Sequence, residues 1–224
     1  MVVGPFAPAL LKVHPIERLR YVARSGWAGP SDLGAEAAWA LADLAQHEPA
    51  AVLPACRRLL ERNPACGPLW WVAARMLDAG DLVSAAERCA DELDDDPTDE
   101  LLEKALARGA RVVRHGGVAE VTAADIVLIE TQAMGPTGMV VDGDLVGLLE
   151  AASAAGTDVW VEAGTGRVLP ARLWEALADR LPRSVTVSDL SGVTRVAGPS
   201  GVRPLAEALA SSGCPEPPEL TGRW

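Results

Sequence analysis

The stretch ADIVLIETQAMGPTGMVVDGDLVGLLEAASAAGTDVWVEA (residues 124–163) decides the fold class. It begins with the nearly continuous apolar run DIVLI (125–129) and ends with DVWVE (158–162), and residues 145–155 between them have a helical pattern. Apolar runs of this length are typical of parallel strands that are covered on both faces. A strand, a helix and a second strand in this order predict a βαβ unit with a right-handed crossover.

The rest of the C-terminal half continues the same alternation. We expect further strands at 110–114 and 184–188, with another candidate at 194–197, and helices at 170–181 and 204–211. The predicted fold class is therefore α/β, with a small Rossmann-like parallel sheet flanked by helices in residues 105–224.

The N-terminal half has a helical period and is predicted to form a helical domain over residues 1–104. The expected helices cover 15–24, a longer segment from Ser31-Asp32 to Pro49, 52–61 and a segment from Leu69 to Ala79. The acid-rich run DELDDDPTDE (91–100) marks the boundary between the two halves. We interpret it as a solvated helix end and turn, because it lacks the glycine and the alternation of a calcium-binding loop.

Composition excludes several classes of function. The formal net charge is −11, from 20 basic and 31 acidic residues, and such a protein repels nucleic-acid backbones and anionic membranes. The N-terminus MVVGPFAPALLKVHP has neither the basic region nor the unbroken apolar run of a signal peptide, and no apolar stretch is long enough to span a membrane. We therefore expect a cytoplasmic protein without direct nucleic-acid or membrane partners.

The metal-binding and redox residue types are dispersed. The four cysteines form no CxxC pair and are expected to be buried thiols. The histidines do not cluster with them, and His115, which follows the strand at 110–114, is more typical of a structural than of a catalytic residue. The cysteines are Cys56, Cys66, Cys89 and Cys214, and the histidines are His14, His47 and His115. We expect no metal and no cofactor.

Ligands of open α/β sheets bind at the carboxyl ends of strands, so the candidate site consists of the loops that follow the predicted strands. The loop 189–192 is in such a position but adds no candidate residue. The candidate ligand-binding residues, in the loops after 129 and 161, are Glu130, Gln132, Gly135, Gly138, Asp142, Gly143, Glu162, Gly164, Thr165 and Arg167.

Each part of this candidate site has an alternative interpretation. The glycines match neither GxGxxG nor a P-loop, and they could serve only turns. The sequence EAGTGR (162–167) could hold a phosphate or carboxylate, or it could be a surface loop with a solvated Arg167. The carboxylates Glu130, Asp142, Asp144 and Glu162 could converge as an acid/base pair or a magnesium site, which spacing alone does not decide.

The order of these segments resembles the core of the translation initiation factor 2B α/β/δ superfamily, which includes methylthioribose-1-phosphate isomerase and ribose-1,5-bisphosphate isomerase. RNPACGPLWWVAARM (62–76) is similar to a segment of the family's helical half, with Pro64, Leu69, Trp71 and Met76 in place, and PPEL (217–220) resembles the family's C-terminal Pro-x-x-Leu. The resemblance covers most of the chain and implies the family's fold.

The departures from the family pattern fall on its functional positions. The family's Gly-Ala-Asp corresponds to Glu130-Thr131-Gln132, so the amide Gln132 replaces a proton-transferring carboxylate. The Asn-Lys pair corresponds to Asp142-Gly143, the helical-half Arg and Asn correspond to Asn63 and Pro68, and the catalytic Cys segment is missing between residues 91 and 110.

The resemblance therefore implies a catalytically degenerate relative, which acts as a ligand-binding, regulatory or scaffolding module. A homodimer and a small phosphorylated ligand are its expected partners. The alternative is an isomerase-type enzyme acting on a sugar phosphate or nucleotide phosphate, with Glu130, Asp142 or Glu162 as acid/base and Arg167 as anion clamp.

Overall fold

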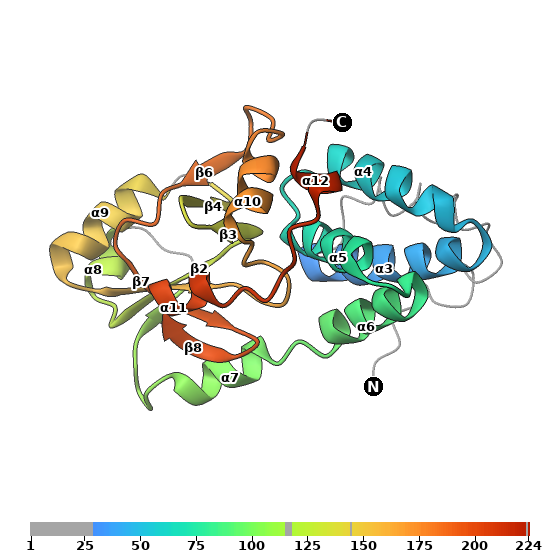
Figure 1. The fold of residues 1–224 in the computed structure, drawn as a ribbon. Coiled ribbons are helices and arrows are strands. Elements are labelled where there is room, and N and C mark those ends of the chain that lie inside the picture. Colours follow the sequence, from blue (N-terminus) through green and yellow to red (C-terminus); the bar gives the residue numbers. More distant parts are fainter. Residues whose placement is uncertain (1–28, 115–117, 144, 223) are drawn as a thin grey trace.

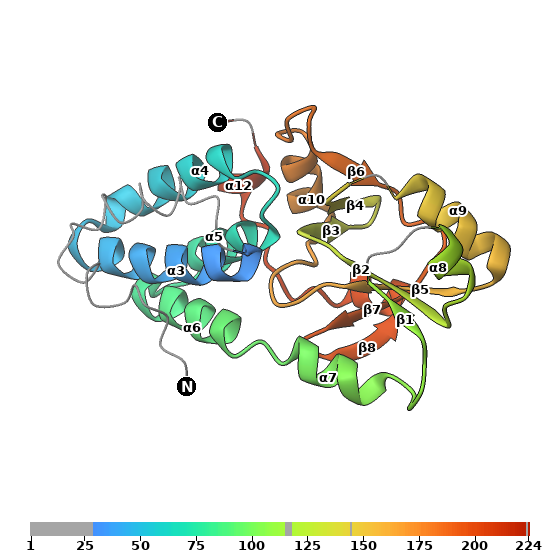
Figure 2. The ribbon, with the colours of Figure 1, turned by 180° about the vertical axis from the view of Figure 1, so that it is seen from behind.

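The computed structural model of the protein describes residues 29–114, 118–143, 145–222 and 224. Within these residues a helical N-terminal region packs beside an α/β region built on a mostly parallel sheet, which confirms the predicted fold class (Figure 1). Seen from behind, the C-terminal helix α12 (Pro218–Thr221) lies next to α4 (Val52–Arg62) on the helical side (Figure 2). The helix predicted at 15–24 lies outside the described residues.

Small residues bring the N-terminal helices close together. These helices are α3 (Pro30–His47), α4 (Val52–Arg62), α5 (Gly67–Asp78) and α6 (Leu82–Asp94), with a 3-10 turn η1 (Pro49–Ala51) after α3. Ala37, Ala38 and Ala40 of α3 have no exposed surface, and a Cβ at Gly34 would lie 2.7 Å from the Cβ of Pro68 in α5. The α3 helix can therefore pack directly on α5 and α6.

The main sheet has the strand order β1-β2-β5-β7-β8. Its strands are β1 (Val112–Val113), β2 (Ile126–Glu130), β5 (Asp158–Glu162), β7 (Val193–Gly198) and β8 (Gly201–Pro204). All neighbours pair in parallel except β7 and β8, which pair antiparallel. Since α9 (Val146–Ala155) lies between β2 and β5 in the chain, the predicted βαβ unit is confirmed.

The prediction that residues 184–188 add a strand to the parallel sheet is wrong. The strand β6 (Thr186–Ser188) belongs to a separate antiparallel sheet, in which it pairs with β4 (Gly138–Val141). β4 also pairs with β3 (Ala133–Gly135), so the segment after β2, which was expected to be a loop, forms a hairpin. Pro136 and Thr137 form the two-residue turn between the paired Gly135 and Gly138.

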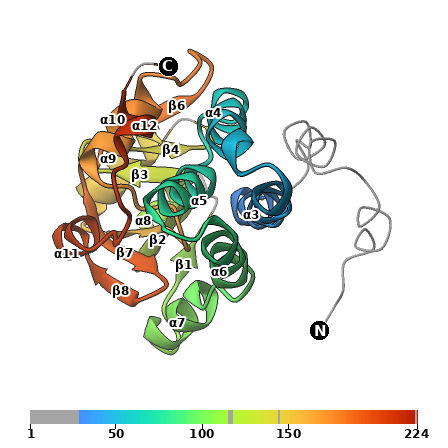
Figure 3. The same cartoon turned by 45° about the vertical axis from the view of Figure 1, so that its right-hand side comes forward.

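Helices cover both faces of the main sheet. They are α7 (Thr98–Ala105) on one face, and α8 (Val118–Thr122), α9 and α11 (Leu205–Ala210) on the other. Leu128 and Trp160 pack with Leu102 of α7, whereas Val127 and Val159 belong to the cluster on the opposite face. Figure 3 shows α11 beside β7 and β8, at the end of the sheet far from β1.

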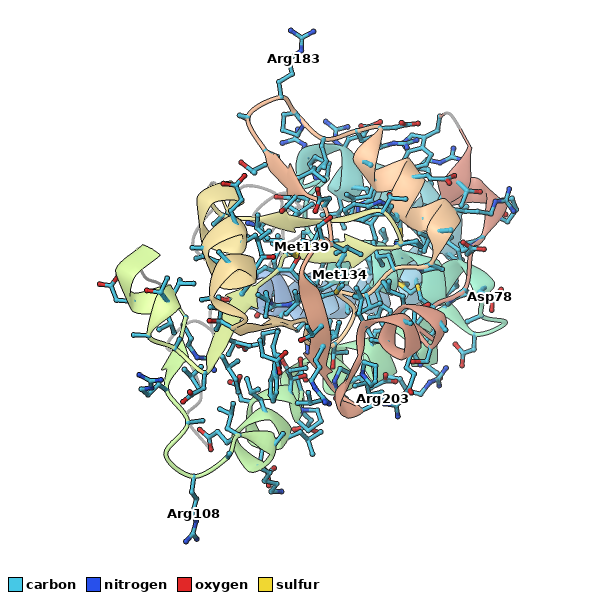
Figure 4. The ribbon with its side chains drawn as sticks, turned by 90° about the vertical axis from the view of Figure 1, so that its left-hand side faces the viewer. Asp78, Arg108, Met134, Met139, Arg183 and Arg203 are labelled. Carbon is cyan, nitrogen blue, oxygen red and sulfur yellow. The ribbon has the colours of Figure 1, made fainter. Side chains whose placement is uncertain are left out.

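The hairpin β3–β4 is a buried layer between the two regions. Its paired residues Ala133 and Val140 belong to the core of the N-terminal helices, and the paired residues Met134 and Met139 belong to the core beneath the main sheet. Figure 4 shows both methionines inside the molecule, while surface arginines extend away from it. The helix α10 (Ala171–Ala178) packs on this hairpin through Trp174.

Candidate functional site

The carboxyl ends of β2 and β5 open into a cleft of about 540 Å³ at the junction of the two regions. Glu130 and Glu162, the last residues of these strands, are register partners and both line the cleft. The other lining residues come from α3, the α6–α7 connection, α7, the end of β1 and the loop after β5. They are Ser31, Asp96, Thr98, Asp99, Glu103, Arg114, Gly164 and Arg167.

Arg167 already has several partners within the protein. Its Nη1 donates to Glu130 Oε1 at 2.8 Å and to the main-chain oxygen of Thr131 at 2.8 Å, and its Nη2 donates to Ser31 Oγ at 3.3 Å. The side chain is 11% exposed, and its Nε is buried without a hydrogen-bond partner among the described residues. The arginine that the sequence offered as an anion clamp thus connects α3 to the end of β2.

Glu162 is the most buried acidic side chain among the ion pairs described, at 12% exposed, and it pairs with Arg114. Burial raises the pKa of the Glu162 carboxyl, the neighbouring Asp99 carboxyl raises it further, and Arg114 opposes both effects. Arg114, Asp96 and Asp99 were absent from the sequence-based candidates. Arg114 could have been found from its position after the first strand of the sheet.

Asp96 connects the α6–α7 segment to the loop after β5. Its carboxylate accepts hydrogen bonds from the Thr165 main-chain N–H at 2.7 Å and from the N–H of Thr98 at 3.0 Å. A Cβ at Gly164 would lie 2.4 Å from Asp96 Oδ2, so the glycine lets the carboxylate approach this closely. The interpretation of the acidic run as a solvated turn therefore fails at this residue, because its carboxylate bonds to a neighbouring loop.

Gln132 and Asp142 lie outside the cleft. The Gln132 Nε2 donates to Asp142 Oδ1 at 2.8 Å, and the Gln132 main-chain oxygen accepts from the Gly67 N–H of α5 at 3.0 Å. Neither side chain lines the cleft, and Asp142 is exposed. The proposed convergence of Glu130 with Asp142 is therefore not observed, while Glu130 and Glu162 do come together.

The glycines of the hairpin serve packing and turns. A Cβ at Gly135 would lie 2.2 Å from Trp174 Cγ, and one at Gly138 would lie 2.9 Å from the Ser188 main-chain oxygen. The Trp174 Nε1 also donates to Thr137 Oγ1 at 2.8 Å. Gly143 has a φ of +86°, and a Cβ there would meet no described atom within 4 Å, which suits a turn.

The cleft carries more acid than base. Five of its lining residues are acidic, Asp96, Asp99, Glu103, Glu130 and Glu162, and two are basic, Arg114 and Arg167, which gives a formal balance of 2 − 5 = −3. Both arginines are paired with glutamates of the same cleft. A phosphate would meet net repulsion and no unpaired cation among the lining residues.

Cysteine thiols and metal-ligand clusters are missing from the described part of the chain around this cleft. The cysteines are buried and none lines it; burial raises the thiol pKa to about 12 for Cys56, Cys66 and Cys214 and to about 11 for Cys89. No group of three or more histidine, cysteine or acidic residues within the described ranges could hold a metal ion. His115 and Asp144 lie outside those ranges.

A helix that spans a bilayer must be both long and predominantly apolar. None of the helices in the described part of the chain combines these two properties.

Comparison with known proteins gives matches in structure alone. No protein-family model matches the sequence, and no curated protein matches it. The fold is similar to eIF2B beta from Chaetomium thermophilum, with a TM-score of 0.67 at 10% identity over 88% of this chain and 90% of that one. It is also similar to a chain of the tetrameric eIF2B-beta2-delta2 complex of the same organism, with a TM-score of 0.68 at 11% identity over 88% and 92% of the two chains.

An archaeal protein shows the same likeness. The translation initiation factor eIF-2B of Pyrococcus horikoshii OT3 matches with a TM-score of 0.65 at 12% identity, over 87% of this chain and 98% of that one. The resemblance predicted from the sequence is thus confirmed at the level of the fold. The protein has the fold of the translation initiation factor 2B-like proteins.

Proposed function

We propose that the protein is a non-catalytic relative of the initiation factor 2B-like isomerases, which acts as a binding and assembly module. The observation that supports this most is the pairing of both cleft arginines. Arg167 binds Glu130 and Arg114 binds Glu162, so each cation at the carboxyl edge is held by a carboxylate of the same edge. The polar groups there stabilise the junction between the two regions.

Catalysis on a phosphorylated substrate would require these ion pairs to break. A phosphorylated substrate would have to displace Glu130 from Arg167, and the freed carboxylate would then repel the substrate. Gln132, at the position that corresponds to the family's acid/base carboxylate, does not titrate near neutral pH and donates to Asp142 instead. The two ion pairs therefore favour a junction in which the cleft arginines stay bound to glutamates of the protein over one in which they bind a substrate.

Assembly is the second part of the proposal. One similar structure is described as a tetrameric complex, which supports an expectation of self-association on the same fold. We propose that this chain forms a homodimer. We also propose that it does not bind nucleic acid or membranes directly. The formal charge of −11 supports the exclusion of nucleic acid.

The test combines turnover with sedimentation. The full chain is incubated with phosphorylated aldoses and followed by ³¹P NMR, and its mass is measured by analytical ultracentrifugation over a range of concentrations. We expect no new phosphorus resonance and a dimer mass. A product resonance would overturn the non-catalytic role, and a monomer at every concentration would overturn the homodimer.

A second candidate function follows from one observation, the half-buried Glu162 with a raised pKa inside a cleft. Raised carboxyl pKa values are typical of general acids, and the isomerase-type alternative would use this group with Glu130. Glu162→Gln and Glu103→Gln form a matched pair, since both residues line the cleft and Glu103 is exposed. Turnover that Glu162→Gln abolishes and Glu103→Gln retains would establish this function in place of the first.

A further inference from the structure

A second, smaller hollow lies on the other side of the loop that follows β5. Its volume is about 80 Å³, and it lies at the carboxyl ends of β5 and β7, against α11. The lining residues that matter are Gly164, Gly198, Ser200, Arg203, Ser211 and Ser212.

The strand register places Arg203 on the face of the sheet that α11 covers. Arg203 of β8 is the register partner of Val196 in β7, and cross-strand partners project to the same face. Val196 belongs to the core cluster that includes Leu205 and Ala208 of α11, while Val202 packs on the opposite face with α7. Figure 4 labels Arg203 at this end of the molecule.

Arg203 differs from the cleft arginines because no described residue forms an ion pair or a side-chain hydrogen bond with it. It is half-buried, and within the described part of the chain it makes neither an ion pair nor a hydrogen bond through its side chain. Glu207, four residues later in α11, is exposed and forms no ion pair with it. No carboxylate is among the residues that line the hollow, although the protein as a whole is strongly acidic.

The walls of the hollow supply neutral donors. Ser200 sits in the two-residue turn between the paired Gly198 and Gly201, and Ser212 follows α11. The Ser211 hydroxyl already donates to the Glu207 main-chain oxygen at 2.8 Å, which leaves Ser200 and Ser212 as hydroxyl donors. A Cβ at Gly198 would lie 3.0 Å from the Ala163 main-chain oxygen, so glycine lets the β5 and β7 loops approach and form one wall.

We propose that this hollow binds a small oxyanion, either inorganic phosphate or the phosphoryl group of a small metabolite. The Arg203 guanidinium presents several N–H donors in a plane, which matches the oxygens of a phosphate, and the hydroxyls of Ser200 and Ser212 complete the donor set. The proposed oxyanion site is separate from the acidic cleft, so the proposal does not depend on whether the cleft is catalytic. It also gives the expected phosphorylated ligand a place that the cleft does not offer.

The experiment measures phosphate binding to the full chain by ¹⁵N–¹H NMR and isothermal titration calorimetry, with chloride at equal ionic strength as the reference. Arg203→Gln removes the charge, and Ser200→Asp places a carboxylate in the exposed turn beside it. Arg183→Gln is the matched control, because Arg183 projects into solvent from the loop after α10 (Figure 4). Glycerol 3-phosphate, tested in parallel, distinguishes a phosphoryl group from the free ion.

We expect wild type and Arg183→Gln to bind phosphate equally, with shifts at the Gly198 and Gly201 amides. Arg203→Gln and Ser200→Asp should bind about tenfold more weakly or worse, which is the loss expected for one charge-assisted contact. Tighter binding of glycerol 3-phosphate than of phosphate would assign the site to phosphorylated metabolites. Equal binding by all variants, or no amide shift in wild type, would overturn the proposal; the Ser200→Asp variant keeps the test valid if Arg203→Gln does not fold.

Discussion

The two glycine-bearing segments that follow β2 and β5 were both candidates for a ligand site, and they have different roles in the structure. In the hairpin β3–β4, the glycines allow Trp174 and β6 to pack against the backbone, and side chains are buried on both faces. In the loop 163–168, Gly164 allows the Asp96 carboxylate to approach, and hollows open on both sides of the loop. Glycine composition alone does not distinguish packing from binding.

The largest loss of stability is expected for a substitution in the hairpin β3–β4. Gly135→Ala would place a Cβ 2.2 Å from Trp174 Cγ, so the buried indole would have to move. We expect a loss of about 3 kcal/mol in the free energy of unfolding, the upper part of the range for overpacking. Urea denaturation measures it, with Gly147→Ala as control, because that glycine lies in α9 with open space around it. An equal stability for both variants would show that the hairpin is not packed as described.

The next largest loss of stability is expected for a substitution of Arg167 in the loop after β5. Arg167→Gln leaves the buried main-chain oxygen of Thr131 without its donor and Glu130 without its cation. We expect a loss of about 2 kcal/mol, since the Glu130 side chain is 55% exposed and water screens its part of the interaction. Arg183→Gln, in an exposed loop, should leave the unfolding free energy within about 0.5 kcal/mol of wild type. Loss of stability in both variants alike would argue for a general charge effect instead.

Asp96 gives a smaller effect on the same loop. Asp96→Ala removes the acceptor for the Thr165 and Thr98 N–H groups, which resembles the loss of a helix cap. We expect about 1 kcal/mol of destabilisation. Asp95→Ala is the matched control, because its side chain is exposed and lies one residue away. Faster amide hydrogen exchange at Thr165 should accompany the Asp96 variant alone, and unchanged exchange there would contradict the proposed contact.

The sequence was sufficient for the fold because the elements that decide it have strong local patterns. The runs at β2 and β5 are nearly all apolar, and the α9 pattern between them has a helical period. For β6 the sequence was misleading, because the alternation Ser-Val-Thr-Val-Ser predicts a strand without indicating which sheet that strand joins. In the structure, Val187 of β6 is 47% exposed, so one face of this strand is open to solvent. Pairing partners are set by tertiary packing, which local periodicity does not encode.

The site was harder to predict than the fold because its contacts join residues far apart in the chain. Glu130, Glu162 and Arg167 could be chosen since the two glutamates end strands of the sheet and Arg167 lies in the loop after one of them. Asp96 and Ser31 come from the helical region and reach the cleft only through the packing of the two regions, with Ser31 136 positions from Arg167. A single sequence contains no signal for such a contact.

The smallest effect is the pH dependence from Glu162. The raised pKa means that the folded protein binds a proton to this carboxyl more tightly than the unfolded chain does. Its contribution to stability is therefore fully present below the unfolded pKa of the group and is lost as the pH rises through the raised folded value. Urea denaturation of wild type and Glu162→Gln from about pH 4 to 7 isolates this contribution, because the other carboxylates titrate in both proteins. We expect wild type to lose stability relative to Glu162→Gln as the pH increases; the opposite trend would mean that the Arg114 ion pair outweighs burial and that Glu162 is held as a carboxylate in the junction.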